Sequence, residues 1–385
     1  MEVVTQYQHN PVTSESSAVA FFQKQFGRIT MFRTSRRSAI LGAIAAIAMT
    51  TVAFADEMKP LNSDIEPDRM DWSQLEAKFG PMPAVEKGMK VGAVAKALTN
   101  EYWRSLGEGY VKFGAKVGVT VDLQAGQNEN DQLAQLAIAE NMLSQGYKLL
   151  LVSPQTDSNL QPAVEAAEKA GVPVINVNDA VIPSAKNYIG NVQKDNGVRA
   201  ARWFIANRKD GGKLAVIEGM AGVYAAVQRT AGFKETIAAE GKGLEVVASV
   251  PGNWDRQLSY DAATNIMSQH PDITGFYCNN DGMALGVVEA VKAAGKLDKI
   301  SVIGTDGISD AYASIKAGEL TATVDSFPVL TGEVALEVAL RLQAGQKLPR
   351  VVATPQALVT KDNIARYTGD EATVRANLME DAKGM

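Results

Sequence analysis

Polar side chains that could bind a polyhydroxylated molecule stand where several apolar runs of this chain end. The most informative stretch, 273–290, is an apolar run, a polar turn at Asn279, Asn280 and Asp281, and then an apolar segment of helical period. Asn and Asp at such a turn can cap the helix or bind ligand hydroxyls. Capping is the simpler interpretation of one isolated turn, but similar turns recur along the chain. Within this turn we expect Asn280 to face a ligand, and Asp281 to cap the helix or to hold Asn280.

The other candidate residues occupy junctions of the same kind. They supply paired hydrogen-bonding groups or flat aromatic faces: Lys96, Asn100, Tyr102, Trp103, Asn178, Asp179, Arg229, Trp254, Asp306 and Ser326. Sugars and polyols require this combination, because their hydroxyls need paired polar groups and their C–H faces need aromatic surface. Each residue also has a plain structural alternative, such as a core tryptophan, a helix cap or a surface ion pair. Their joint placement favours a binding site.

The elements that must position these residues alternate between strand and helix from Met89 onward. The predicted strands are 90–95, 120–124, 149–153, 172–177, 213–218, 245–250, 273–278, 301–304 and 320–324, with helical stretches between them. Such alternation predicts parallel sheet covered by helices on both faces. The number of strands is large for one sheet, so we expect two. In parallel sheets the carboxyl ends of the strands share one edge, where the candidate residues would converge.

An export signal is predicted ahead of this region. Arg33, Arg36 and Arg37 precede an apolar run at 39–52, and 53–55 fits the small-x-small rule for cleavage after Ala55. Because signal peptides normally begin a chain, we expect Met31 to be the true start, and finding residues before it by N-terminal sequencing would refute this. The acidic, proline-containing stretch 56–88 is predicted to be an extension with one short helix near 72–79.

Composition excludes several classes of protein. The 385 residues suffice for two domains, and a net charge of -5 disfavours a nucleic-acid partner. The single cysteine, Cys278, excludes an internal disulfide and Cys-rich metal sites, and only two histidines are present. No Walker-type phosphate loop occurs. Gly219 and Gly222 match only part of a dinucleotide fingerprint, so a tight turn is the better interpretation. We expect no cofactor and no metal.

Beyond these patterns, the chain resembles the periplasmic solute-binding proteins of the ribose/galactose type, which deliver ligands to ABC importers. The resemblance covers roughly 90–360. It rests on segments 98–103, 222–233, 254–256, 280–286 and 304–307. The ribose type is the better match, because no calcium loop of alternating Asp and Asn is found.

The resemblance implies two doubly wound α/β lobes that close by a hinge on a ligand in the cleft between them, a mode of closure for which this class of proteins is a standard example. Crossings between the lobes are expected near Asn191, Ser326 and Ala353. The implied N-terminal lobe is 89–191 plus 327–353, and the C-terminal lobe is 192–326 plus 354–385. The family's ligand contacts carry over onto Asn100, Tyr102, Trp103, Asn178, Arg229, Trp254, Asn280 and Asp306.

The site also departs from the ribose pattern. Asn178 and Asp179 replace an Asp-Arg pair, Ser326 replaces a glutamine, and Lys96 stands where a small hydroxyl residue is usual. We expect Trp254 and one of Tyr102 or Trp103 to sandwich the ligand. Arg229 and Asp306 should form charge-assisted bonds to hydroxyls. Lys96 should either neutralise Asp179 or Asp306, or recognise an anionic ligand.

The resulting functional prediction is a monomeric periplasmic substrate-binding protein of an ABC importer. Its ligand would be a pentose-like monosaccharide or a sugar alcohol, its partner a membrane permease, and it would catalyse no reaction. Two alternatives stay open: a receptor module for chemotaxis or quorum signalling, and a sugar-modifying enzyme. A DNA-binding repressor built on the same lobes would need a basic helix-turn-helix where this chain has its export signal.

Overall fold

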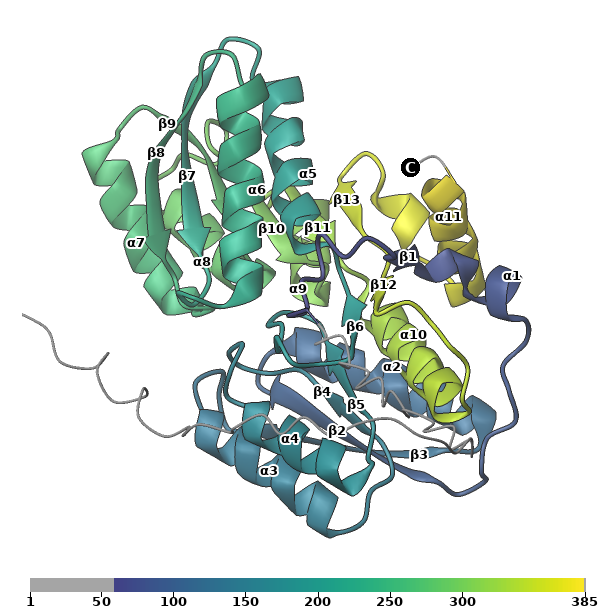
Figure 1. Cartoon of the computed structure of the whole chain (residues 1–385). Coiled ribbons are helices and arrows are strands. Elements are labelled where there is room, and N and C mark those ends of the chain that lie inside the picture. The colour runs from purple at the N-terminus through teal and green to yellow at the C-terminus, as the bar shows by residue number, and fades with distance from the viewer. Residues whose placement is uncertain (1–58, 384–385) are drawn as a thin grey trace, which may run out of the picture. The chain divides into compact units, whose positions relative to one another are not determined.

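The computed structural model describes residues 59–383 (Figure 1). The predicted export signal, its cleavage after Ala55 and the start at Met31 lie outside this range. Within it, the strands form two separate sheets, as expected. No helix among these residues is long and apolar enough to cross a membrane.

The first sheet has seven parallel strands. In spatial order they are β1 (Met70–Asp71), β12 (Val351–Ala353), β6 (Asn187–Gly190), β5 (Val174–Val177), β4 (Leu150–Val152), β2 (Lys90–Ala97) and β3 (Thr120–Gly126). One face is covered by α3 (Gln132–Ser144) and α4 (Gln161–Ala170), and the other by α2 (Glu101–Val117) and α10 (Pro328–Gln343) (Figure 1).

The second sheet has six strands, parallel except at one edge. Their order is β13 (Ala357–Thr360), β11 (Ala322–Asp325), β10 (Ser301–Asp306), β9 (Ile273–Cys278), β7 (Gly212–Glu218) and β8 (Leu244–Pro251), with β13 antiparallel to β11. The helices of this sheet are α5 (Gln193–Asn207) and α6 (Tyr224–Glu240) on one face, α7 (Arg256–Gln269) and α8 (Asp281–Ala293) on the other, and α9 (Ser309–Ala317) (Figure 1).

Glycines set the close packing of the helix pairs. A Cβ at Gly109 of α2 would lie 2.0 Å from the carbonyl oxygen of Val329 in α10. A Cβ at Gly286 of α8 would lie 2.1 Å from the carbonyl oxygen of Arg256 in α7. A Cβ at Gly197 of α5 would likewise lie 2.0 Å from the carbonyl oxygen of Arg229 in α6. These distances are far below van der Waals contact, so no larger residue fits without moving a helix.

The chain passes between the two sheets three times: after β6, after β11 and after β12. Two of these passages are tied together, because Asn191 Nδ2 donates to Thr354 Oγ1 at 3.1 Å. All nine predicted strands are present. The sequence did not reveal β1, β6, β12 and β13, which are only two to four residues long.

The N-terminal extension contacts both halves of the structure. Leu61 N donates to the carbonyl of Pro183 beside the first sheet at 2.8 Å. The carboxylate of Asp64 accepts from Gln193 N at 3.0 Å and Lys194 N at 2.7 Å. Helix α5 has no side-chain cap of its own, so Asp64 supplies the anionic partner at its amino end. The predicted helix near 72–79 is confirmed as a 3-10 turn (Trp72–Gln74) followed by α1 (Leu75–Phe79).

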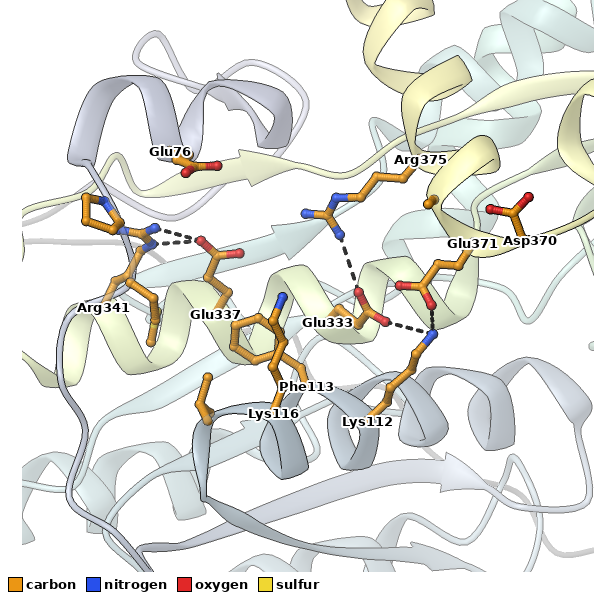
Figure 2. A pocket seen from close by; sticks show the side chains of 14 residues that line it. Glu76, Lys112, Phe113, Lys116, Glu333, Glu337, Arg341, Asp370, Glu371 and Arg375 are labelled. Carbon is orange, nitrogen blue, oxygen red and sulfur yellow. Dashed lines mark hydrogen bonds and ion pairs between the residues drawn. The ribbon is translucent and has the colours of Figure 1, made fainter.

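The chain ends in a 3-10 turn (Ile364–Tyr367) and α11 (Glu371–Lys383), which packs beside α2 and α10. A hollow of about 830 Å³ opens between α1, α2, α10 and α11 (Figure 2). Its charges are largely paired with one another: Glu333 meets Lys112 at 3.4 Å and Arg375 at 3.3 Å. It contains none of the predicted site residues.

Candidate functional site

Eight of the eleven predicted site residues surround one small cavity. Its lining residues are Asn100, Tyr102, Trp103, Glu129, Asp179, Arg229, Trp254, Asn280 and Asp306. They come from loops and helix starts at the carboxyl ends of strands in both sheets. Residues as far apart in sequence as 100 and 306 therefore meet between the two sheets.

The first sheet contributes its aromatic residues from the start of α2. Asn100 is the N-cap, and its Oδ1 accepts from Tyr102 N at 3.0 Å, which fixes the first turn. Tyr102 and Trp103 are buried and lie edge to face, with ring centres 4.8 Å apart. The cap thus sets the direction of both rings.

The second sheet contributes Trp254, whose indole lies over the backbone at Gly219. A Cβ at Gly219 would lie 2.0 Å from the indole ring, so only glycine leaves room for it. The partial glycine fingerprint of the sequence therefore has a local role, consistent with the tight-turn interpretation. The indole Nε1 of Trp254 is buried and has no hydrogen-bond acceptor in the described chain.

Backbone strain is concentrated at this site. The described residues include six non-glycine residues with positive φ: Asn178, Asp179, Asn253, Trp254, Asp306 and Phe327. Four of them are predicted site residues, and the other two are their immediate neighbours or lie next to Ser326. Such conformations cost on the order of 1–3 kcal/mol each and persist where the surroundings enforce them, most often at functional sites.

A buried ion network runs through the cavity wall. Asp179, which follows β5, accepts from Lys96 Nζ at 2.8 Å and from Arg229 at 3.0 Å. Arg229 belongs to α6, so its contact joins the two halves of the site, and its guanidinium also lies 3.6 Å from Asp306. Lys96 and Asp179 both belong to the first sheet. Of the two interactions predicted for Lys96, its neutralisation of Asp179 is the one observed.

Burial and neighbouring charge act in opposite directions on these groups. Burial alone would raise the pKa of Asp179, but Lys96 and Arg229 together hold that pKa below its usual value. Burial raises the pKa of Asp306 well above its usual value, because the single charge of Arg229 only partly offsets it. The pKa values of the two carboxyl groups thus shift in opposite directions, because Asp179 has two neighbouring cations and Asp306 has one.

Arg229 is held rigidly. Its Nε donates to Gln193 Oε1 at 2.9 Å, and Nη1 donates to the carbonyl of Asn279 at 2.6 Å. The side-chain oxygen of Asn279 in turn accepts from Gly219 N at 3.0 Å, so Asn279 helps to hold Arg229 in place. The sequence did not single out Gln193, which stands at the first position of α5.

The three remaining predicted residues lie behind the cavity wall. Lys96 contacts the wall through Asp179. Asn178 donates to the hydroxyl of Tyr102, and its Oδ1 accepts from Asn191 N at 3.0 Å. Ser326 donates to the carbonyl of Asp306 at 3.3 Å. In this arrangement their polar groups position the residues that line the cavity.

The turn at 279–281 divides its roles differently from the prediction. Asn280 lines the cavity, but it is also the N-cap of α8, since its Oδ1 accepts from Met283 N at 2.9 Å. Asp281 is not the cap. Its carboxylate accepts from Gly307 N at 2.7 Å and from Thr323 Oγ1 at 2.7 Å, which fastens the turn that carries Asp306.

Glu129 is a member of the site that the sequence analysis missed. Its Oε1 accepts from Asn100 Nδ2 at 2.8 Å and from Trp103 Nε1 at 2.9 Å. Burial raises its pKa, and the charge of Lys96 partly offsets this. The loop at 127–131 is rich in Asn, Gln and Asp, a composition that resembles an ordinary surface loop, so no sequence signal marked Glu129.

The cavity itself has a volume of about 10 Å³, room for roughly one water molecule. A hollow of about 370 Å³ adjoins it and shares Asn100, Glu129, Trp254 and Asn280. A molecule as large as a sugar can reach the inner residues only if the two halves of the site move apart. Within residues 59–383, no cluster of three acidic, His or Cys side chains suits a metal ion.

The arrangement is suited to binding polar molecules that also have an apolar face. From behind the cavity wall, the ammonium nitrogen of Lys96 lies 5.3 Å from the ring centre of Trp103 and 5.4 Å from that of Trp254. Carboxylate and guanidinium groups next to these rings can bond hydroxyls in defined directions.

Comparison with known proteins gives a consistent result. Residues 91–347 match the family model described as periplasmic binding protein domain. The chain is 34% identical over 272 residues to the D-allose-binding periplasmic protein of Escherichia coli, and the aligned region covers 68% of this chain and 87% of that protein. It is also 34% identical over 277 residues to the ribose import binding protein of Bacillus subtilis, covering 72% and 88%.

Solved structures show the same architecture. A solute-binding protein from Actinobacillus succinogenes with bound D-allose matches with a TM-score of 0.69 at 29% identity, covering 72% of this chain and 100% of that one. A protein from Bacillus halodurans with bound myo-inositol matches with a TM-score of 0.67 at 27% identity, covering 75% and 99%.

Proposed function

The chain belongs to the periplasmic sugar-binding proteins of the ribose type, and on this premise we propose that it is the substrate-binding component of an ABC importer. It binds a monosaccharide or sugar alcohol between its two α/β lobes and releases it to a membrane permease. Its relatives are named for allose or ribose or contain bound allose or myo-inositol, so they support the class of the ligand and not one compound.

One observation carries the proposal. Trp103 from one lobe and Trp254 from the other border a cavity whose remaining wall is Tyr102 together with carboxyl, amide and guanidinium groups. We propose that the ligand stacks between these rings, with its hydroxyls bound by Asp179, Arg229 and Asp306. Lys96, Asn178 and Ser326 support these contacts from behind.

Sheet membership supports lobe boundaries at 89–191 with 327–353 and at 192–326 with 354–385, although α11 packs on α2 and α10 of the first lobe. We propose that the protein is a monomer without catalytic activity, and that the segment ending at Ala55 exports it to the periplasm. A role in signalling would use the same clamp.

A ligand screen tests the proposal. The mature chain, beginning at Asp56, is heated with a panel of pentoses, hexoses, sugar alcohols and cyclitols. A ligand that binds only the folded protein raises the free energy of unfolding by about 2.7 kcal/mol at a hundredfold excess over its Kd. At least one compound should raise the melting temperature in a concentration-dependent way. A panel without any shift would contradict the proposal, and turnover of a bound compound would contradict the absence of catalysis.

A further inference from the structure

We propose that the cleft selects a ligand with a protonated amine, an amino sugar or amino polyol, and that Glu129 receives its ammonium group. The inference rests on the proposed function, because it names the ligand class of the same site. It follows from the balance of charge and of hydrogen-bonding capacity in the cavity wall.

Acidic side chains outnumber basic ones at the cavity. Three carboxylates belong to it, from Glu129, Asp179 and Asp306, against two cations, Lys96 and Arg229. Asp179 contacts both cations, at 2.8 and 3.0 Å. Among the described residues, Asp306 forms an ion pair only with Arg229, at 3.6 Å. In the described chain Glu129 forms no ion pair, and its partners Asn100 and Trp103 are neutral.

Two of the acidic side chains at the cavity also have carboxylate oxygens that accept no hydrogen bond from residues 59–383. Glu129 uses one carboxylate oxygen for two donors, and the described residues offer no donor to its second oxygen. The side-chain oxygens of Asp306 likewise accept no hydrogen bond from these residues. The cavity therefore presents open acceptors on Glu129 and Asp306, beside one buried donor, Trp254 Nε1, that has no acceptor among the described residues. An ammonium group, with three donors and no acceptor, complements the two carboxyl groups better than a ligand carboxylate does.

The same balance argues against an acidic ligand. Lys96 is fully buried and already paired with Asp179, which also occupies Arg229. In this arrangement both cations that the described residues place at the cavity already have a carboxylate partner, so a ligand carboxylate would have to compete with Asp179 for Arg229, and burying an unpaired charge is costly. The lysine thus balances Asp179 and does not mark an anion site.

The aromatic walls already accommodate a cation. The Lys96 ammonium lies 5.3 Å from the ring centre of Trp103 and 5.4 Å from that of Trp254. Positive charge is attracted to such ring faces. A second ammonium held by Glu129 would lie beside Trp103, whose indole nitrogen bonds the same carboxylate.

Calorimetric titration of the mature protein with matched compounds tests the inference. D-Allose, D-glucose and D-galactose are each compared with their 2-amino-2-deoxy and N-acetylamino forms, and the last two also with their uronates. We expect the amine of at least one series to bind tenfold or more tightly than its neutral parent. The N-acetyl form keeps the nitrogen without the charge and should lose this advantage, and the uronates should not bind measurably.

Two variants refine the test. In Glu129→Gln the ratio of amine to neutral affinity should fall to about one, while Glu165→Gln, an exposed glutamate that bonds Gln161 on α4, should keep the wild-type ratio. Glutamine retains the acceptor for Asn100 and Trp103, and a melting curve checks folding. Equal or tighter binding of the neutral parents, or tight binding of a uronate, would overturn the inference and leave sugar binding intact. If no compound of the panel bound, the inference would fail, whereas the proposed function would fail only if the broader screen of pentoses, hexoses, sugar alcohols and cyclitols also gave no shift.

Discussion

At the scale of single residues, the central feature is a buried ion pair that does not depend on the second lobe. Lys96 and Asp179 both belong to the first lobe, and both are shielded from water. Removing one partner of such a pair leaves an uncompensated buried charge. The pair is therefore expected to stabilise the lobe that presents the site, whether or not a ligand is bound.

Lys96→Ala should lower the free energy of unfolding of the ligand-free protein by on the order of 3 kcal/mol, as expected for a broken buried pair whose remaining carboxylate keeps one other partner. Lys186→Ala is the matched control. Its pair with Glu168 has the same 2.8 Å separation but lies in solvent, so no measurable change is expected. Urea unfolding of both variants checks this, and equal effects would show that burial does not govern the pair.

Asp325 carries a second residue-scale prediction. Burial raises its pKa to about 8, well above the usual range of an aspartate, although its carboxylate accepts hydrogen bonds from Tyr312 Oη and Phe327 N. Because the folded pKa lies above the unfolded one, the folded state holds the proton more tightly. The associated stability is present at acidic pH and is lost as the pH rises from about 4 to about 8.

Asp325→Asn removes this titration, so its melting temperature should decline less than that of the wild type between pH 6 and pH 8. Asp362→Asn, at an exposed position, should keep the wild-type slope. A decline as steep in Asp325→Asn as in the wild type would mean that Asp325 does not bind its proton in this range.

At the scale of elements, helix α8 contains two glycines with opposite surroundings. A Cβ at Gly286 would collide with the carbonyl of Arg256 at 2.1 Å, whereas nothing lies closer than 3.7 Å to a Cβ at Gly282. Alanine is intrinsically better than glycine in a helix by roughly 0.5–1 kcal/mol.

Gly282→Ala should therefore leave the free energy of unfolding unchanged or slightly raised. Gly286→Ala should lower it by about 1–3 kcal/mol, the usual cost of overpacking, because α7 and α8 must separate. Chemical denaturation measures the free energy of unfolding of both variants. A value for Gly286→Ala above that of the wild type would contradict the close packing of α7 against α8.

The sequence predicted some of the strands well and others not at all. Long apolar strands flanked by periodic helices were predictable, because burial on both faces leaves a strong hydrophobic pattern. Strands β6, β12 and β13 were not, since each has at most four residues and lies next to a passage between the lobes. β1 escaped prediction because it is a two-residue edge in an otherwise irregular extension.

The site was predictable to a similar degree. Residues with distinctive chemistry at strand ends, such as Trp254, Arg229 and Asp306, converge on the cavity. Glu129 was missed because its importance comes from a bond to Trp103 that no local pattern encodes. For Asp281 the sequence left two roles open, capping α8 or holding Asn280, and the cap is in fact Asn280, because both residue types cap well and only tertiary contacts separate them.

At the scale of the whole molecule, the two lobes meet through Arg229 and through the N-terminal extension. Arg229 bonds Asp179 across the cleft, and Asp64 of the extension caps α5 in the second lobe while Leu61 bonds the first. The inner cavity is too small for a sugar in this arrangement. If the ligand binds in this cavity, as we propose, its entry separates Arg229 from Asp179, and ligand hydroxyls replace that contact on closure.

Titration calorimetry on site variants tests the central claim most directly. A sugar or polyol that the wild-type mature protein binds is titrated into Trp254→Ala and Asp306→Ala, which remove the second lobe's aromatic face and its carboxylate. If the ligand lies between the two lobes at this cavity, both variants should lose binding or bind at least a hundredfold more weakly, with their folding verified by melting curves. Affinity close to that of the wild type in both variants would show that the ligand binds elsewhere.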